Sequence, residues 1–183
     1  QAMTQWLGFP HYGDEYKVMG LAPYGTPIYR EKLGALVTLR DNGTYELNQQ
    51  LFTLRDGIEY TWNGGQPVFG PLYSSALEDL LGPARDPAGP LEQFHKDMAR
   101  SVQELFEDAY FNVLNALYKV APSDNLCLSG GCAMNSVANG KVYERTPFKA
   151  MYLPAAAGDA GGAVGAALYV SEEIGQKAER PIM

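Results

Sequence analysis

Residues 125–140 read Asn-Leu-Cys-Leu-Ser-Gly-Gly-Cys-Ala-Met-Asn-Ser-Val-Ala-Asn-Gly, and this stretch says most about the fold. The apolar residues 126–128 predict a short buried strand, Gly130-Gly131 predict a sharp turn, and residues 132–140 predict a helix. Strand, glycine turn and helix in this order bring backbone N–H groups close to a phosphate or nucleotide. A tight turn without a ligand gives the same pattern, so the residues alone leave both interpretations open.

A second glycine-rich turn follows the apolar residues 150–153, which predict another short strand. It contains Asp159 among glycines and leads into a predicted helix over residues 161–174. Loops at strand ends of α/β sheets often present functional groups, and a carboxylate there can bind a metal ion or a ligand hydroxyl. Asp159 could equally cap the helix that follows. The two turns, about one βα unit apart, suggest one site built from both.

The rest of the α/β pattern surrounds these turns. Residues 91–120 carry apolar side chains at the i, i+3, i+4 spacing of a helix, with a wide buried face that we expect to pack on a sheet. The sequence Asp-Asn-Gly at 41–43 lies between extended runs and predicts a β-hairpin of strands 35–40 and 44–49. We therefore predict an α/β fold with a mixed sheet that includes parallel pairs, an N-terminal β-hairpin and packed helices.

Glycine and proline interrupt the pattern elsewhere. Residues 16–21 predict a short helix ended by Pro23 and Gly25. Residues 51–90 are predicted to be a loop excursion that covers a site, with one helix over 75–81 and Ser74 as a possible N-cap.

Lys17 and Gly20 form a third candidate for function. Lys17 offers a point charge for a phosphate or carboxylate, and Gly20 leaves space beside it. By residue type alone the signal is weak, because a solvated cluster of acidic and basic side chains needs no function.

Composition narrows the class of protein. The 183 residues are 46% hydrophobic and 19% charged, as in an ordinary globular domain. The net charge of −7 argues against a nucleic-acid binder. The sequence contains no run of about 18 apolar residues, so we predict no membrane span. We expect a cytoplasmic protein in which Cys127 and Cys132 are buried thiols rather than a disulfide. Because the chain starts at Gln1 without an initiator Met, we also expect a segment of a longer protein.

Three motifs together resemble the O-carbamoyltransferase family, which includes nodulation protein U and the enzymes that carbamoylate cephem and aminoglycoside antibiotics. The motifs are Glu-Tyr-Lys-Val-Met-Gly-Leu-Ala-Pro-Tyr-Gly at 15–25, Leu-Ser-Gly-Gly-Cys-Ala-Met-Asn-Ser at 128–136, and Gly-Asp-Ala-Gly-Gly-Ala-Val-Gly-Ala-Ala at 158–167. They occur in the family's order, with Gly82-Pro83, Arg85 and the long helix between the first two. The resemblance therefore spreads over nearly the whole chain.

The resemblance implies an actin-like ATPase fold of the RNase H-like kind, with this chain as a single partial domain, the C-terminal half of the carbamoyltransferase domain. In the family, carbamoyl phosphate and ATP form carbamoyladenylate, and the carbamoyl group then passes to a hydroxyl of a small acceptor. Carried over by motif, Gly130, Gly131 and Asn135 should contact the adenylate. Asp159 should be one ligand of a divalent metal, for which iron is expected, while Lys17 and Gly20 lie in a motif near the nucleotide.

Two departures limit what the isolated chain is expected to do. The family's histidine metal ligands lie in the N-terminal half, and neither His11 nor His95 falls in a matching motif. The carbamoyladenylate-forming domain is absent too, so we expect the segment alone to have little or no activity and to need the remaining parts of the parent polypeptide. A phosphotransferase or ATPase of the same fold superfamily and a non-catalytic nucleotide-binding module remain alternatives.

Overall fold

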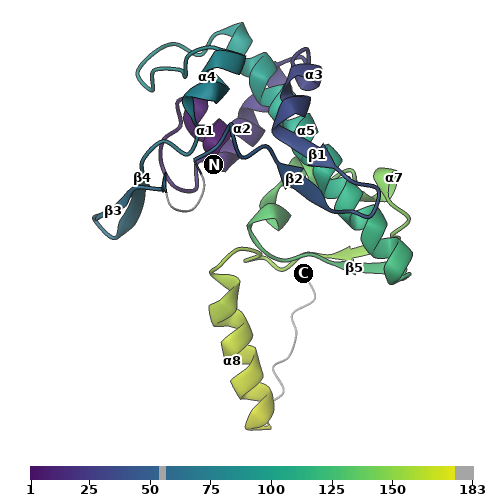
Figure 1. Cartoon of the computed structure of the whole chain (residues 1–183). Coiled ribbons are helices and arrows are strands. Elements are labelled where there is room, and N and C mark those ends of the chain that lie inside the picture. The colour runs from purple at the N-terminus through teal and green to yellow at the C-terminus, as the bar shows by residue number, and fades with distance from the viewer. Residues whose placement is uncertain (54–56, 176–183) are drawn as a thin grey trace. The chain divides into compact units, whose positions relative to one another are not determined.

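The computed structural model describes residues 1–53 and 57–175. The chain divides into two compact units, Gln1–Val120 and Ala121–Met183 (Figure 1). The first unit holds α1 (Ala2–Trp6), α2 (Glu15–Leu21), the 3-10 helix η1 (Ala22–Tyr24), α3 (Arg30–Leu33), the 3-10 helix η2 (Gly34–Leu36), β1 (Val37–Leu39), β2 (Tyr45–Leu47), β3 (Tyr60–Asn63), β4 (Gln66–Phe69), α4 (Ser75–Leu81) and α5 (Gln93–Val120).

The long helix α5 organises the first unit, as the apolar spacing predicted. It packs mainly against α2, η1 and α3, and within the described part of its unit it meets a sheet only at the β1–β2 hairpin, where the Asn112 Nδ2 donates to the Arg40 carbonyl at 3.0 Å. The reason is visible at Gly25, whose missing Cβ lets the loop after η1 touch the carbonyl of Lys96 on α5. The Asp97 carboxylate then accepts from the Thr26 N–H at 2.8 Å, which fixes the loop against the helix. Short helical segments thus occupy the place that a sheet was expected to take.

The core of this unit is built from residues of all five of its α-helices, together with η2 and Leu51. Trp6 and Leu7 are fully buried, and the Trp6 indole Nε1–H donates to the Gly82 carbonyl at 3.1 Å. The fully or nearly fully buried apolar residues of this cluster are Trp6, Leu7, Val18, Leu33, Leu36, Leu51, Leu77, Leu81, Met98, Ala99 and Leu105.

Two antiparallel hairpins accompany these helices. The predicted one is confirmed, although its strands β1 and β2 are shorter than expected, with Leu39 opposite Tyr45 across the Asp-Asn-Gly turn. The second, β3–β4, was not predicted. Gly64 and Gly65 both have positive φ, of 57° and 81°, as a two-residue type I′ turn requires. The glycine pair that was interpreted as an interruption is therefore the turn of a hairpin.

The helices over 15–21 and 75–81 are confirmed with almost the predicted bounds. Ser74 occupies the N-cap position of α4, but its hydroxyl makes no cap hydrogen bond. It donates instead to the Gln50 carbonyl at 2.6 Å and so ties the start of the helix to residues 48–51.

The second unit contains β5 (Asn125–Cys127), the 3-10 helix η4 (Gly131–Met134), α6 (Ser136–Asn139), α7 (Val142–Arg145), β6 (Ala150–Tyr152) and α8 (Gly161–Glu173). Strands β5 and β6 pair in parallel, with Leu126 opposite Met151, which confirms the predicted parallel pairing. The single mixed sheet is a wrong prediction, because the strands of the described residues form three separate two-stranded sheets.

The thiols were also predicted wrongly in one respect. Both Cys127 and Cys132 are free, and both are exposed rather than buried. In the three-residue strand β5 only the central Leu126 faces the interior, so Cys127 lies on the open face. No helix in the described parts of the chain has the length and apolar character that crossing a membrane requires.

Candidate functional site

The two glycine-rich turns of the second unit are joined by hydrogen bonds. The Gly130 N–H donates to the Ala157 carbonyl at 2.7 Å, and the Ser129 hydroxyl donates to the same oxygen at 3.3 Å. One step earlier, the Leu128 N–H continues the strand pairing by donating to the Tyr152 carbonyl at 3.0 Å. Because β5 and β6 are parallel neighbours, the loops that leave their carboxyl ends meet at one edge. The two glycine-rich loops are therefore neighbours; that they form one ligand site stays a prediction.

Glycine is required at specific points of these loops. Gly130 has φ 96°, a conformation that side chains other than glycine rarely adopt. A Cβ on Gly161 would strike the Ala156 carbonyl, and one on Gly158 would lie 3.1 Å from the Met134 sulfur. A Cβ on Gly131 would meet nothing. The backbone at Gly131 is therefore open to an approaching ligand, whereas Gly158 and Gly161 permit close packing of the loops and Gly130 permits the turn.

The helix predicted over 132–140 is wrong in its continuity. The chain forms the 3-10 turn η4, passes through an extended residue at Asn135 (φ −76°, ψ 90°), and starts again as α6. The Asn135 Oδ1 accepts from the Ala138 N–H at 3.0 Å and caps α6. The Asn139 Nδ2 donates to the Ala133 carbonyl at 2.7 Å and holds the two short segments together. Asn135 thus has a structural role in addition to any contact with a ligand.

Asp159 lies in the second loop, two residues before α8. Its side chain is exposed, and the structure gives its carboxylate no hydrogen bond or ion pair with the described residues. The N-cap of α8 is Ala160, so Asp159 does not act as the N-cap of this helix. Within residues 1–53 and 57–175, no group of three or more His, Cys, Asp or Glu side chains could hold a metal ion. Asp159 can supply one ligand of such a site.

Lys17 is part of an ion pair in the first unit. Its Nζ lies 2.7 Å from the Asp14 Oδ1, and Asp14 is only 6% exposed, with its Oδ2 accepting from the His11 N–H at 3.2 Å. The hydrogen bond to Asp14 raises the pKa of Lys17, so the ammonium stays charged at neutral pH. Nζ also lies 5.8 Å from the centre of the Phe9 ring. Gly20, one turn further along α2, has open space where a Cβ would be.

Arg85 lies between the first two motifs, and its contacts were not predicted from the sequence. Its guanidinium donates to the carbonyls of two segments. Nε donates to Leu7 at 2.7 Å and Nη2 donates to Gly8 at 3.1 Å, in the segment after α1, while Nη1 donates to Gly89 at 2.6 Å. It also lies over the Phe9 ring at 5.2 Å. Only glycine fits at Gly8, because a Cβ there would come within 2.8 Å of the guanidinium. Arg85 therefore fixes the segment that carries Phe9, the ring beside Lys17.

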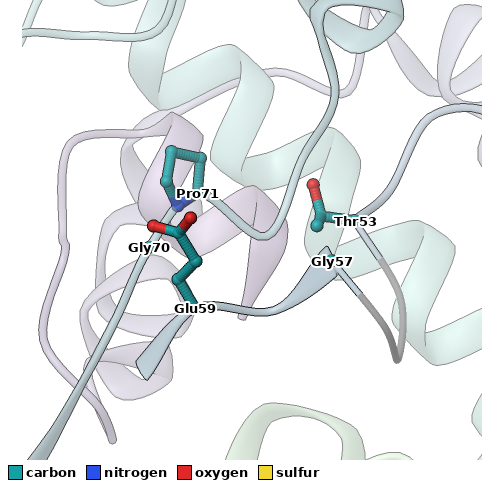
Figure 2. Close-up of a pocket in the computed structure, with 5 residues that line it drawn as sticks. All are labelled: Thr53, Gly57, Glu59, Gly70 and Pro71. Carbon is teal, nitrogen blue, oxygen red and sulfur yellow. The ribbon is translucent and has the colours of Figure 1, made fainter. Parts of the chain in front are cut away.

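The first unit also has a surface pocket of about 290 Å³ beside the hairpin β3–β4. Thr53, Gly57, Glu59, Gly70 and Pro71 line it, and Figure 2 shows the side chains of Glu59 and Pro71 together on one side, with Thr53 opposite. None of the residues predicted to be functional lines this pocket. Among the lining residues that the structure describes, Glu59 has the one ionisable side chain.

The candidate residues thus fall into two groups. Gly130, Gly131, Asn135 and Asp159 lie together in the loops of Ala121–Met183, while Lys17 and Gly20 belong to Gln1–Val120. The first group offers open backbone at Gly131 and, at the same sheet edge, a carboxylate that has no partner among the described residues. Such an edge can hold a ligand between the loops and place the carboxylate near it.

Comparison with known proteins gives a consistent result. The sequence model of the family described as carbamoyltransferase N-terminus matches residues 1–168. An uncharacterized protein of Synechocystis sp. is 40% identical over 171 residues, which cover 92% of this chain and 26% of that protein. Nodulation protein NolNO of Sinorhizobium fredii is 37% identical over 177 residues, covering 96% of this chain and 23% of the relative. Nodulation protein NolO of Bradyrhizobium diazoefficiens is 36% identical over 175 residues, which cover 91% of this chain and 27% of that protein. The chain thus spans about a quarter of the length of these relatives.

Proposed function

Because this chain belongs to the carbamoyltransferase N-terminus family, we propose that it is part of a longer cytoplasmic O-carbamoyltransferase with an actin-like ATPase fold. The whole enzyme would make carbamoyladenylate from carbamoyl phosphate and ATP, then move the carbamoyl group to a hydroxyl of a small-molecule acceptor. The observation that carries the proposal is the hydrogen-bonded pair of loops, in which the Gly130 N–H reaches the Ala157 carbonyl two residues before Asp159.

The first loop would form the wall that faces the adenylate. The open backbone at Gly131 lets a ligand approach the chain without meeting a Cβ. The Asn135 carboxamide, whose oxygen caps α6, would contact the ligand beside this loop. Because the cap fixes the side chain, the amide would be oriented before the ligand binds.

Asp159 would hold a divalent metal ion, for which we expect iron, as one of several ligands. Its carboxylate has no competing partner among the described residues, which suits this role, and the remaining ligands would come from other parts of the polypeptide. When bound, such an ion polarises a carbonyl oxygen and stabilises the negative charge that develops on it during transfer. The chain's own contribution is to position the carboxylate through the bond between the two loops.

Lys17 and Gly20 would lie near the nucleotide. The buried Asp14 holds the Lys17 ammonium in place, and the ammonium keeps two further N–H groups with which to contact an anionic ligand. Gly20 would let the backbone of α2 come close to that ligand. Arg85 would act on this region through Phe9 by fixing the segment that packs beside Lys17.

The proposal is tested with the full-length polypeptide that contains residues 1–183. It is incubated with carbamoyl phosphate labelled in the carbamoyl carbon, ATP and a panel of hydroxyl compounds, and the label in each acceptor is measured. Transfer of the labelled carbamoyl group supports the proposal. Transfer of the γ-phosphate of ATP instead would show a phosphotransferase, and failure to bind adenine nucleotide at all would show a non-catalytic module.

Three variants assign the roles. Asp159→Asn should lower kcat by roughly 100-fold or more and reduce the metal content of the purified enzyme, because it removes a charged ligand. Asn135→Asp keeps the oxygen that caps α6 and removes the amide, so it should weaken nucleotide binding without unfolding the loop. Asp124→Asn is the matched control, since Asp124 is an exposed carboxylate paired with Lys149 at 2.9 Å, and it should leave both quantities unchanged.

A further inference from the structure

Gly20 lies inside the helix α2, at a position where the structure gives no steric reason for glycine. A Cβ there would meet nothing within 4 Å among the described residues, and Gly20 is not one of the glycines with a positive φ. Gly25, by contrast, is required, because a Cβ there would strike the Lys96 carbonyl. Glycine inside a helix is less favourable than alanine, because it loses more backbone freedom on folding. Gly20 therefore lowers the stability of α2 and leaves open space beside it.

The space beside Gly20 has an aromatic residue on one side. Ala22, which follows α2, is still in the right-handed helical region, so α2 continues into η1 without a break. Tyr24 is the fourth residue after Gly20, and residues four apart lie on the same face of a helix. Helical side chains lean toward the N-terminus, which directs the Tyr24 ring toward the turn that holds Gly20. A larger residue in place of Gly20 would pack against this ring, whereas glycine leaves room for a ligand to do so.

The helix α5 runs beside α2 (Figure 1) and fixes the backbone around Tyr24. The Gln93 Nε2 donates to the Tyr24 carbonyl at 3.2 Å and to the Asp97 Oδ1 at 2.9 Å. The same Asp97 oxygen accepts from the Thr26 N–H, and Asp97 is buried. These contacts all lie within Gln1–Val120, so they do not depend on the second unit. The main chain at Tyr24 is thus held from α5, while its ring has no stacking or hydrogen-bond partner among the described residues.

A fixed positive charge lies at the other end of the same face. Lys17 is three residues before Gly20, and its ammonium lies 2.7 Å from the Asp14 carboxylate. The centre of the Tyr16 ring is 5.9 Å from the same ammonium. Tyr24 follows Lys17 by two helical turns, about 10–12 Å along the axis. A nucleoside monophosphate has a phosphate, a sugar and a planar base in line, which matches this order of ammonium, open space and aromatic ring.

We infer that Tyr24 is the residue that recognises the base of the adenine nucleotide, by stacking its ring on the adenine. The phosphate then meets the Lys17 ammonium, and the sugar lies over Gly20. Stacking on an aromatic side chain suits a base, whereas an ammonium contacts any phosphate whatever base it carries. Tyr24 would therefore provide the preference for a nucleotide over a simple sugar phosphate. The inference rests on the proposed binding of an adenine nucleotide, and it assigns a separate part of that ligand to each of the three residues.

The test is photolabelling of the full-length polypeptide with azidoadenosine monophosphate, whose azide is on the adenine ring. Trypsin cleaves after Lys17 and Arg30 and releases residues 18–30 as one peptide, in which the label is measured by mass spectrometry. The probe concentration that gives half-maximal labelling of this peptide is determined for each variant. Adenosine monophosphate and ribose 5-phosphate are added as competitors in parallel samples. Because the concentration is compared and not the amount of label, loss of a single cross-linked residue does not distort the result.

In the wild type, adenosine monophosphate should suppress the labelling of residues 18–30, and ribose 5-phosphate should do so much less. Tyr24→Ala should raise the half-maximal concentration by roughly 10-fold, and Tyr24→Phe, which keeps the ring, by about twofold or less. Gly20→Leu should also raise it by roughly 10-fold, because its side chain fills the space beside Tyr24. Tyr45→Ala removes an exposed tyrosine of the β1–β2 hairpin and should change nothing.

Three results would overturn the inference. The first is equal half-maximal concentrations for Tyr24→Ala and Tyr24→Phe, since a stacking ring must matter. The second is suppression by ribose 5-phosphate as strong as that by adenosine monophosphate, which would show that the base is not recognised. The third is labelling confined to other peptides, or labelling of residues 18–30 that adenosine monophosphate does not suppress.

The same experiment separates this inference from the proposed function. Photolabelling needs neither carbamoyl phosphate nor an acceptor, so labelling that depends on Tyr24 without any carbamoyl transfer would contradict only the chemistry. Carbamoyl transfer by an enzyme that is labelled only outside residues 18–30 would contradict only the role of Tyr24.

Discussion

Replacing Arg85 by Ala should destabilise the unit Gln1–Val120 far more than loss of an ordinary surface arginine. The guanidinium joins the segment after α1 to the loop before α5 through short bonds to the Leu7 and Gly89 carbonyls, at 2.7 and 2.6 Å. Hydrogen bonds from a charged donor contribute about 1.5–3 kcal/mol each. Arg85 is only half-buried, so water replaces part of what is lost and the lower value applies to both bonds. The expected loss is therefore about 3 kcal/mol.

Arg85→Lys should lower the free energy of unfolding by less, about 2 kcal/mol, because an ammonium keeps the charge but lacks the planar group that reaches two loops at once. With a urea dependence of about 1.5–2 kcal/mol per molar, the unfolding midpoint should fall by roughly 1.5–2 M for the Ala variant. The expected order of stability, from highest to lowest, is wild type, Arg85→Lys and Arg85→Ala.

The assay is urea unfolding followed by the fluorescence of Trp6. Trp6 is fully buried and bonded to the Gly82 carbonyl, close to the loops that Arg85 joins, whereas Trp62 is 68% exposed. In a protein made of residues 1–183, a Trp62→Phe background leaves Trp6 as the sole tryptophan reporter. Arg40→Ala is the matched control, because Arg40 makes one exposed ion pair with Glu46 and should change stability by less than about 1 kcal/mol. Equal midpoints for the Arg85→Ala and Arg40→Ala variants, with an unchanged urea dependence, would refute the reasoning.

Three further outcomes are expected. Gly43→Ala should lower the free energy of unfolding by about 1–3 kcal/mol, because Gly43 has φ 86° and a Cβ there would strike α5. Gly20 lies in α2 with open space around it, so Gly20→Ala should leave stability unchanged or raise it by up to about 1 kcal/mol. Burial first, and then a neighbouring guanidinium, lower the pKa of His95, so the unfolded chain binds the proton more readily. The stability that this residue contributes should be complete above a pH of about 6.5 and should decline as the pH falls below that value. The His95→Gln variant should flatten this slope in urea titrations. Asp97→Ala leaves the Thr26 N–H without its acceptor and should cost about 1–3 kcal/mol, seen as faster amide exchange at Thr26; an unchanged exchange rate would contradict this.

The elements that sequence predicted well are those with long or strongly marked patterns. The helix α5 shows many turns of apolar periodicity, and the Asp-Asn-Gly turn of the first hairpin has a direct conformational reason in the positive φ of Gly43. Gly64-Gly65 carried a comparable turn signal, but the proline-rich surroundings led to its interpretation as a loop. The broken helix after Gly131 could not be foreseen from propensity, because Asn135 both interrupts it and caps the next segment.

The candidate site was predictable in part for a similar reason. Glycine turns after two strands indicated that the loops would meet, since parallel neighbouring strands end at the same edge. The ion pair of Lys17 with Asp14 follows from the i, i+3 spacing and was available from the sequence. The contacts of Arg85 with Leu7 and Gly8 were not, because these partners lie 78 and 77 residues away in a segment with no regular pattern.

The bond between the Gly130 N–H and the Ala157 carbonyl has a mechanical consequence. A displacement of either loop must stretch this bond, so the two loops move as a pair and a force applied at one is transmitted to the other. A ligand that settles against the first loop would therefore shift the carboxylate on the second without touching it. The exchange rate of a single amide proton, that of Gly130, would record the opening of both.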